Sequence, residues 1–150
     1  MRIVLDTNVL ARAAIRVSGL ARELLLRCTE DPHVIVLSEF IISEVSRVLR
    51  YPRMRNAHRL SDEEIEQYLG HLRSVCVVVV LPTETPPPVV AADAQDDPIV
   101  ATAVVGQVAV LCSRDRHLHQ PEVVDYCRDH AIEVMDDIDL MRRLRENPDS

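Results

Sequence analysis

Residues Met1–Leu10 read MRIVLDTNVL, an apolar run that ends abruptly on an acid, a hydroxyl and an amide. The run Ile3–Leu5 predicts a short buried strand of a parallel sheet, because both faces of such a strand are covered. Ligands of open α/β folds bind at the carboxyl ends of these strands. Asp6, Thr7 and Asn8 directly follow the predicted strand, so Asp6 is the first candidate functional residue.

Further apolar runs predict four more strands, over residues 34–37, 75–81, 108–112 and 131–134. Segments with helical spacing separate them, at residues 9–15, 21–28, 39–49, 62–73, 99–105, 122–130 and 138–144. This alternation predicts an α/β fold: a three-layer α/β/α sandwich with a central five-stranded, mainly parallel sheet. Ser61 with Glu64 fits a capping box, and Asp97-Pro98 fits an N-cap followed by proline.

The length of 150 residues predicts a single domain, with a core over residues 1–145 and a flexible tail at 146–150. No apolar run approaches the ~20 residues of a membrane span, and no export signal opens the chain. The four cysteines are scattered without a CxxC pair, which is typical of small buried residues in a reducing compartment. We therefore expect a cytoplasmic protein that makes no membrane contact.

The charged residues exclude several mechanisms. All 17 basic residues are Arg, so the chain lacks the Lys that a P-loop, a Schiff-base enzyme or a phosphoaspartate fold uses. With three Gly and no GxGxxG run, the dinucleotide fingerprint is absent as well. The net charge of −7 opposes nucleic acid binding unless basic groups are concentrated locally or divalent cations mask the acids.

Three further acids are predicted at the edge that Asp6 occupies. Asp115 follows the fourth predicted strand closely, and Asp97 opens the helix after the third. Glu44 lies in the second turn of the helix after the second strand, beside its apolar stripe. A carboxylate that borders a buried face needs a partner or a cation.

Converging carboxylates without a nearby Lys repel one another, and Mg²⁺ or Mn²⁺ relieves this because these hard cations prefer carboxylate oxygen. The reaction that fits best is hydrolysis of a phosphodiester by metal-activated water. Thr7, Asn8 and Ser113 would orient metal-bound water or a phosphate oxygen. Asp96 can exchange roles with its neighbour Asp97.

Each acid also has a purely structural interpretation. Asp6 can cap the first helix, and Asp97 can cap the helix that follows it in the chain. Glu44 can pair with a surface arginine, and Asp115 can form a turn. These interpretations give no reason for four acids to share an edge.

An Arg-rich segment lies just beyond the Glu44 helix, where guanidinium groups suit the phosphates of an RNA backbone: Arg47, Arg50, Arg53, Arg55 and Arg59. A solvated surface is the alternative. His117 and His119 could indicate zinc, but no nearby Cys completes a ligand set. The apolar segment from Val9 to Leu25 supplies either a dimer face or core packing.

Four stretches resemble the PIN-domain family of metal-dependent ribonucleases, in the order of the family's motifs: residues 3–10 (IVLDTNVL), 37–49 (LSEFIISEVSRVL), 96–103 (DDPIVATA) and 110–118 (VLCSRDRHL). The resemblance implies an α/β/α sandwich with a Mg²⁺ or Mn²⁺ site of one or two ions. Matched position by position, the carboxylates would be Asp6, Glu44, Asp97 and Asp115, with Asn8 and Ser113 as supporting groups.

The spacing is most similar to bacterial and archaeal VapC-like toxins of toxin–antitoxin pairs. That resemblance implies a homodimer held inactive by a small antitoxin protein. The chain departs from the pattern at His117, where relatives often carry another acid, and this bears on a second metal position.

We therefore predict a Mg²⁺- or Mn²⁺-dependent endoribonuclease that acts on single-stranded or structured RNA, as the toxin of a type II pair. The same chemistry would also serve RNA maturation or decay. One rival is a phosphomonoesterase with Asp6 as nucleophile, although Asn8 stands where a second Asp is usual. The other is a PIN-like module that binds a partner or RNA without cutting it.

Overall fold

A computed structural model of the chain describes residues 1–83 and 97–149. Its centre is a five-stranded sheet in the order β3-β2-β1-β4-β5, and every neighbouring pair is parallel. The strands are β1 (Arg2–Leu5), β2 (Val34–Ser38), β3 (Val77–Val79), β4 (Val110–Cys112) and β5 (Glu133–Met135). The predicted parallel α/β fold is confirmed.

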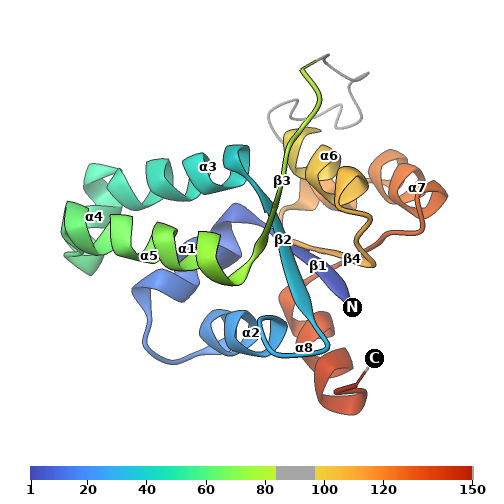
Figure 1. Cartoon of the computed structure of the whole chain (residues 1–150), viewed down its shortest axis with the longest axis horizontal. Helices are drawn as coiled ribbons and strands as arrows, with labels where there is room; N and C mark the ends of the chain where they lie inside the picture. Colours follow the sequence, from blue (N-terminus) through green and yellow to red (C-terminus); the bar gives the residue numbers. More distant parts are fainter. Residues whose placement is uncertain (84–96, 150) are drawn as a thin grey trace.

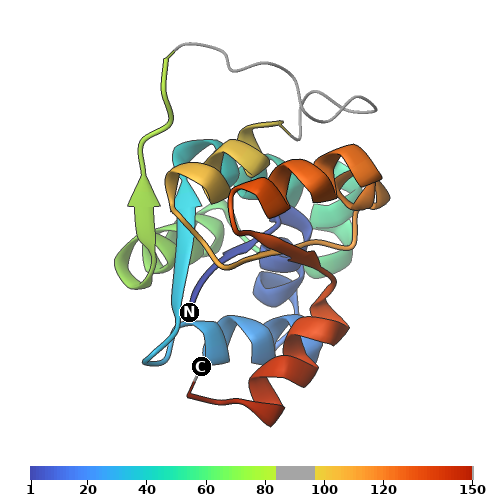
Figure 2. The same ribbon diagram turned by 90° about the vertical axis from the view of Figure 1, so that its right-hand side faces the viewer.

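Helices connect the strands and cover the sheet: α1 (Thr7–Ile15), α2 (Leu20–Cys28), α3 (Glu39–Arg50), α4 (Pro52–His58), α5 (Asp62–Val75), α6 (Asp97–Val105), the 3-10 helix η2 (Arg116–His119), α7 (Pro121–Asp129) and α8 (Asp137–Glu146). Figures 1 and 2 show α6 and α7 on one side of the sheet and α2 and α8 on the other. The helices α3, α4 and α5 form an arm that extends to the left in Figure 1.

The inner strands are buried on both faces, as expected of a parallel sheet. The inner strands β1 and β4 are apolar on both faces, and Ile3, Val4, Leu5 and Leu111 are fully buried. The cysteines are free; Cys28, Cys112 and Cys127 are buried and Cys76 is partly buried, as expected of small core residues. The apolar residues Val9, Leu10, Leu24 and Leu25 also pack in the core.

The sheet register fixes which residues leave the carboxyl edge together. Leu5 pairs with Cys112, and Cys112 pairs with Met135. The next residues continue this alignment, since Asp6 N donates to the Cys112 carbonyl at 2.9 Å and Ser113 N donates to the Met135 carbonyl at 3.0 Å. Side chains that are distant in the sequence therefore emerge side by side.

The structure differs from the sequence-based prediction in the arm. The predicted third strand at residues 75–81 is shorter, because α5 continues to Val75 and leaves only Val77–Val79 paired with β2. Helix α4 was not predicted. It begins with Pro52 at its first turn and buries none of its residues, so it has no apolar stripe. The capping box of Ser61 and Glu64 is present at the start of α5.

Candidate active site

The polar residues after β1 and β4 form one hydrogen-bonded group, which we call the strand-end unit (Asp6, Ser113 and Asp115). The Ser113 hydroxyl donates to Asp6 Oδ2 at 2.6 Å and accepts the backbone N–H of Asp115 at 2.9 Å. Ser113 is fully buried, so this bridge is shielded from water. The structure thus brings together two of the predicted acids and one supporting residue.

Asp6 is a buried carboxylate with few charges to balance it. It is 4% exposed and caps α1, where its Oδ1 accepts the Thr7 N–H at 2.6 Å. Burial raises the pKa of Asp6, hydrogen bonds from Ser113 and Thr7 act in the opposite direction, and the nearby charge of Asp115 raises it further. A bound cation would stabilise the ionised carboxylate in this environment.

The Thr7 hydroxyl is a second feature of this site. Thr7 is 7% exposed, and its Oγ1 has no hydrogen-bond partner among residues 1–83 and 97–149. A buried polar atom without a partner costs free energy, and it is available to a ligand that supplies one. Asn8 differs because its side chain is exposed, while its backbone carbonyl accepts Arg12 Nε at 3.2 Å.

Asp97 is the first residue of α6, a helix that contacts the carboxyl edge of the sheet through Thr102. A buried hydrogen bond of 2.8 Å between Ser38, at the end of β2, and Thr102 holds α6 to that edge. Thr102 also donates to the Pro98 carbonyl at 2.7 Å. Asp96, predicted to exchange roles with Asp97, lies outside the described residues.

Glu44 is in a different environment from the strand-end unit. Its side chain is 26% exposed and forms a two-point ion pair with Arg47 of the same helix, at 2.6 and 3.1 Å. Arg47 also donates to the Tyr51 hydroxyl and lies over its ring, 5.3 Å from the centroid. The structure therefore gives Glu44 the local arginine partner that its structural interpretation predicts.

These placements decide how well the residues suit a divalent cation. In the described part of the chain, no three His, Cys, Asp or Glu side chains lie close enough together to hold a metal ion. Asp6 and Asp115 still offer the hard oxygen ligands that Mg²⁺ and Mn²⁺ prefer, and burial of Asp6 favours a cation. The donor chemistry of Asp6 and Asp115 fits the ion, whereas the Glu44 carboxylate is paired with Arg47.

The two histidines predicted as an alternative zinc site have other contacts. His117 donates its backbone N–H to Asp115 Oδ1 at 2.9 Å, and its ring lies 3.6 Å from the same oxygen. The His119 ring nitrogen Nε2 lies 2.6 Å from the Ser113 carbonyl. Both histidines thus stabilise the loop that carries Asp115.

Asp137 is a site residue that sequence reasoning missed. It is fully buried at the start of α8, and its carboxylate accepts hydrogen bonds from Arg114 Nε at 2.6 Å and from Arg12 Nη2 at 3.4 Å. Arg114 immediately precedes Asp115, and the charge of Arg12 lowers the pKa of Asp6. Asp137 therefore fixes two arginines beside the strand-end unit.

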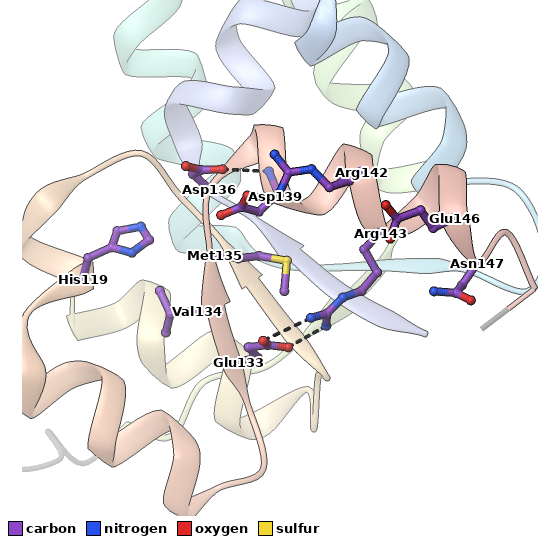
Figure 3. Close-up of a pocket in the computed structure, with 10 residues that line it drawn as sticks. All are labelled: His119, Glu133, Val134, Met135, Asp136, Asp139, Arg142, Arg143, Glu146 and Asn147. Atoms are coloured by element: carbon purple, nitrogen blue, oxygen red, sulfur yellow. Dashed lines mark hydrogen bonds and ion pairs between the residues drawn. The ribbon is translucent and has the colours of Figure 1, made fainter.

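A hollow along β5 and α8, beside this site, has a volume of about 430 Å³. Figure 3 shows the residues that line it. Arg143 faces Glu133 there and forms an ion pair at 2.5 and 3.1 Å, which lowers the pKa of Glu133. The hollow includes His119 and Asp136 but none of the four predicted acids. It lies next to the strand-end unit and is a separate feature.

The Arg-rich segment is partly neutralised by acids at the start of α5. Arg50 pairs with Asp62 and Glu66, both at 2.5 Å, and Arg55 also pairs with Asp62. Arg53 and Arg59 are exposed, and Arg59 ends α4 in the left-handed conformation with φ 57°. The predicted RNA contact of this segment remains a prediction, and three of its five arginines already have acidic partners.

Most of the chain is similar to one known protein family. A family profile described as PIN domain matches residues 2–117 of the chain. No curated protein matches. PIN domains are generally nucleases that use divalent metal ions. The matched segment contains Asp6, Glu44, Asp97 and Asp115, whereas β5 and α8 lie beyond it.

Proposed function

The chain belongs to the PIN domain family, and we propose that within this family it is a Mg²⁺- or Mn²⁺-dependent endoribonuclease. The observation that carries this proposal is the strand-end unit, in which a buried acid and a second acid are joined through Ser113. Such a pair is costly to ionise without a cation. No covalent nucleophile or lysine is needed for phosphodiester hydrolysis of this kind.

Each residue has a distinct part in the proposed chemistry. Asp6, Asp97 and Asp115, joined by Glu44 when it leaves Arg47, would hold the ion. When bound there, the ion lowers the pKa of an attacking water and stabilises the charge on the leaving oxygen. The water oxygen adds to phosphorus and the P–O bond to the leaving nucleotide breaks. The proton that the water loses is balanced by the proton that the leaving oxygen takes up, which yields a phosphomonoester and a hydroxyl end.

The protein groups around the acids would orient the substrate. Ser113 fixes the direction of the Asp6 carboxylate, and the Thr7 hydroxyl can donate to a phosphate oxygen because it has no partner in the described residues. The exposed Asn8 amide would contact RNA outside the buried Asp6 carboxylate. These donors would favour in-line geometry at the scissile phosphate.

The biological role that we propose is that of a toxin in a toxin–antitoxin pair. It rests on the similarity of the motif spacing to VapC-like proteins. The partners would be RNA, a second copy of the chain and a small antitoxin, all in the cytoplasm. Of the described helices, none has the length and apolarity needed to cross a bilayer. Expression that arrests growth, and that a neighbouring small gene relieves, would separate this role from RNA maturation or decay.

Cleavage of end-labelled single-stranded RNA with Mn²⁺ tests the nuclease proposal. We expect Asp6→Asn to lower the cleavage rate by at least about 100-fold, because it removes a metal ligand while keeping the side-chain shape. The matched control is Asp125→Asn, an exposed acid on α7 that pairs only with Arg128 in the described structure. Cleavage that persists in Asp6→Asn, or that continues in EDTA, would show that the proposal is wrong.

A further inference from the structure

A second hollow, of about 700 Å³, lies between the α1–α2 connection and α4. We call it the arginine hollow, because its charged lining consists of Arg12, Arg16, Arg22 and Arg114, together with His58. No carboxylate is among its lining residues in the described structure. Charged lining groups of one sign only are unusual for a chain with a net charge of −7, and these arginines concentrate positive potential at one place.

The arginine hollow adjoins the candidate active site. Arg114 immediately precedes Asp115 of the strand-end unit. Arg12 lies close enough to Asp6 to lower its pKa, and its Nε donates to the Asn8 carbonyl at 3.2 Å. A polymer bound at the acids would therefore pass directly over these arginines.

The arginines are held in place without being fully neutralised. Arg12 and Arg114 share the single buried carboxylate of Asp137. Arg22 donates to the Ala13 carbonyl at 3.4 Å and forms no ion pair within residues 1–83 and 97–149. Arg16 is exposed, and its guanidinium pairs with no other residue in the described ranges.

The shape and chemistry of this hollow favour a nucleotide. A planar guanidinium group can donate two parallel hydrogen bonds to the oxygens of one phosphate, and several guanidinium groups along one wall suit a phosphate backbone. Met54, Ala57 and Leu20 supply an apolar wall that suits a ribose or base. The volume lies in the range of roughly 300–1,000 Å³ that is usual for ligand sites.

We propose that the arginine hollow binds the RNA backbone at a phosphate next to the bond that is cut. This inference rests on the proposed ribonuclease function and extends it by assigning the path of the RNA. The path runs over α1, beside Met54 and His58 of α4. It does not follow Arg50 and Arg55, whose charges are paired with Asp62 and Glu66. Asp137 acts as a positioning residue for this phosphate site, from outside the segment that matches the family profile.

The test measures RNA binding without cleavage. A fluorescein-labelled oligouridylate is titrated in EDTA with the wild type, with the double variant Arg16→Gln/Arg22→Gln, and with a matched control. The control is Arg128→Gln/Arg142→Gln, which removes the same charge from exposed positions on α7 and α8. Equal melting temperatures would confirm that all three proteins are folded.

We expect the hollow variant to bind RNA about tenfold more weakly. Its plot of log association constant against log salt concentration should be shallower, with a slope smaller by ~0.7 for each phosphate that the variant no longer neutralises. The control should change affinity by less than about twofold. Equal weakening in both variants, or none in the hollow variant, would overturn the proposal. The proposal would also be overturned if binding of an oligoglutamate peptide required Arg16 and Arg22 while binding of RNA did not. The hollow would then be a protein-binding site.

A parallel cleavage assay with Mn²⁺ separates this inference from the proposed function. If the wild type cleaves RNA and the hollow variant binds RNA normally, the phosphate site is wrong and the nuclease stands. If the wild type does not cleave but the hollow variant loses RNA binding, the nuclease is wrong and the phosphate site stands.

Discussion

The two sides of the candidate site are built on different principles. On the strand side, Asp6 and Asp115 are joined through Ser113. Backbone pairing at the sheet edge fixes Asp6 and Ser113, and the Ser113 hydroxyl holds the Asp115 N–H. On the helix side, Glu44 is partly exposed and paired with Arg47. At the end of a strand, backbone hydrogen bonds fix the position of a side chain independently of its neighbours. A long, partly exposed side chain on a helix can instead adopt the conformation that pairs it with a nearby opposite charge.

The strongest way to break the strand side is to remove its buried anchor. Asp137→Ala should lower the free energy of unfolding by about 3 kcal/mol, because Arg12 and Arg114 lose their shared partner next to the core. This value is at the low end for a buried pair, since both guanidinium groups remain in contact with water. Urea unfolding measures the change.

The control for that change is Asp139→Ala, two residues further along α8. Asp139 is exposed, and its carboxylate pairs with Arg142 at the surface. We expect it to cost less than about 1 kcal/mol. Equal costs for the two variants would mean that Asp137 does not anchor the site.

A smaller perturbation removes only the bridge of the strand-end unit. Ser113→Ala should destabilise the fold by about 1–3 kcal/mol, since Asp6 loses a buried donor and the Asp115 N–H loses its acceptor. Ser74→Ala removes an exposed hydroxyl and should change stability by less than about 0.5 kcal/mol. Thermal and urea unfolding of both variants test this, and an unchanged Ser113→Ala protein would contradict it.

The pH dependence of stability tests the electrostatics of Asp6. Because the folded pKa of Asp6 is raised, its folded environment favours the neutral form. Its contribution is therefore fully present below the unfolded pKa of about 3.8 and is lost as the pH rises through the folded pKa. In EDTA, the stability of the wild type relative to Asp6→Asn should fall with rising pH in this window. A relative stability that rises would contradict the assignment.

The smallest effect is expected from a change to the Glu44–Arg47 pair on the helix side, and it would show whether Glu44 can act as a metal ligand. If Arg47 competes with a metal ion for Glu44, Arg47→Ala should strengthen Mn²⁺ binding by up to about fivefold, which corresponds to an exposed ion pair of less than about 1 kcal/mol. The matched control is Arg73→Ala, which frees Glu39 on the same helix. Calorimetric titration with Mn²⁺ compares them, and equal affinities would show that Glu44 is not a ligand.

The sequence predicts the strand side well because it depends on local features. Each strand is a short apolar run, and the chain places polar residues directly after β1 and β4. The parallel order then follows from the alternation of strands and helices. Helix α4 has no comparable signal, since none of its residues is buried and Pro52 also fits a turn.

The helix side and the anchor required information that periodicity does not give. The angular position of Glu44 on α3 is predictable, but its choice between Arg47 and a ligand depends on an energy balance of about 1 kcal/mol. Asp137 was missed because the predicted fifth strand stopped at Val134 and the next helix started at Ile138. The rule that located Asp6 also applies to β5, whose last residue Met135 aligns with Cys112.

The central claim is that the strand-end unit holds a divalent cation, and a Mn²⁺ titration at neutral pH tests it most directly. We expect the wild type and Asp125→Asn to bind Mn²⁺ equally, and Asp6→Asn to bind it at least about tenfold more weakly. If Asp6→Asn binds Mn²⁺ as tightly as the wild type, the metal is held elsewhere and the account is contradicted.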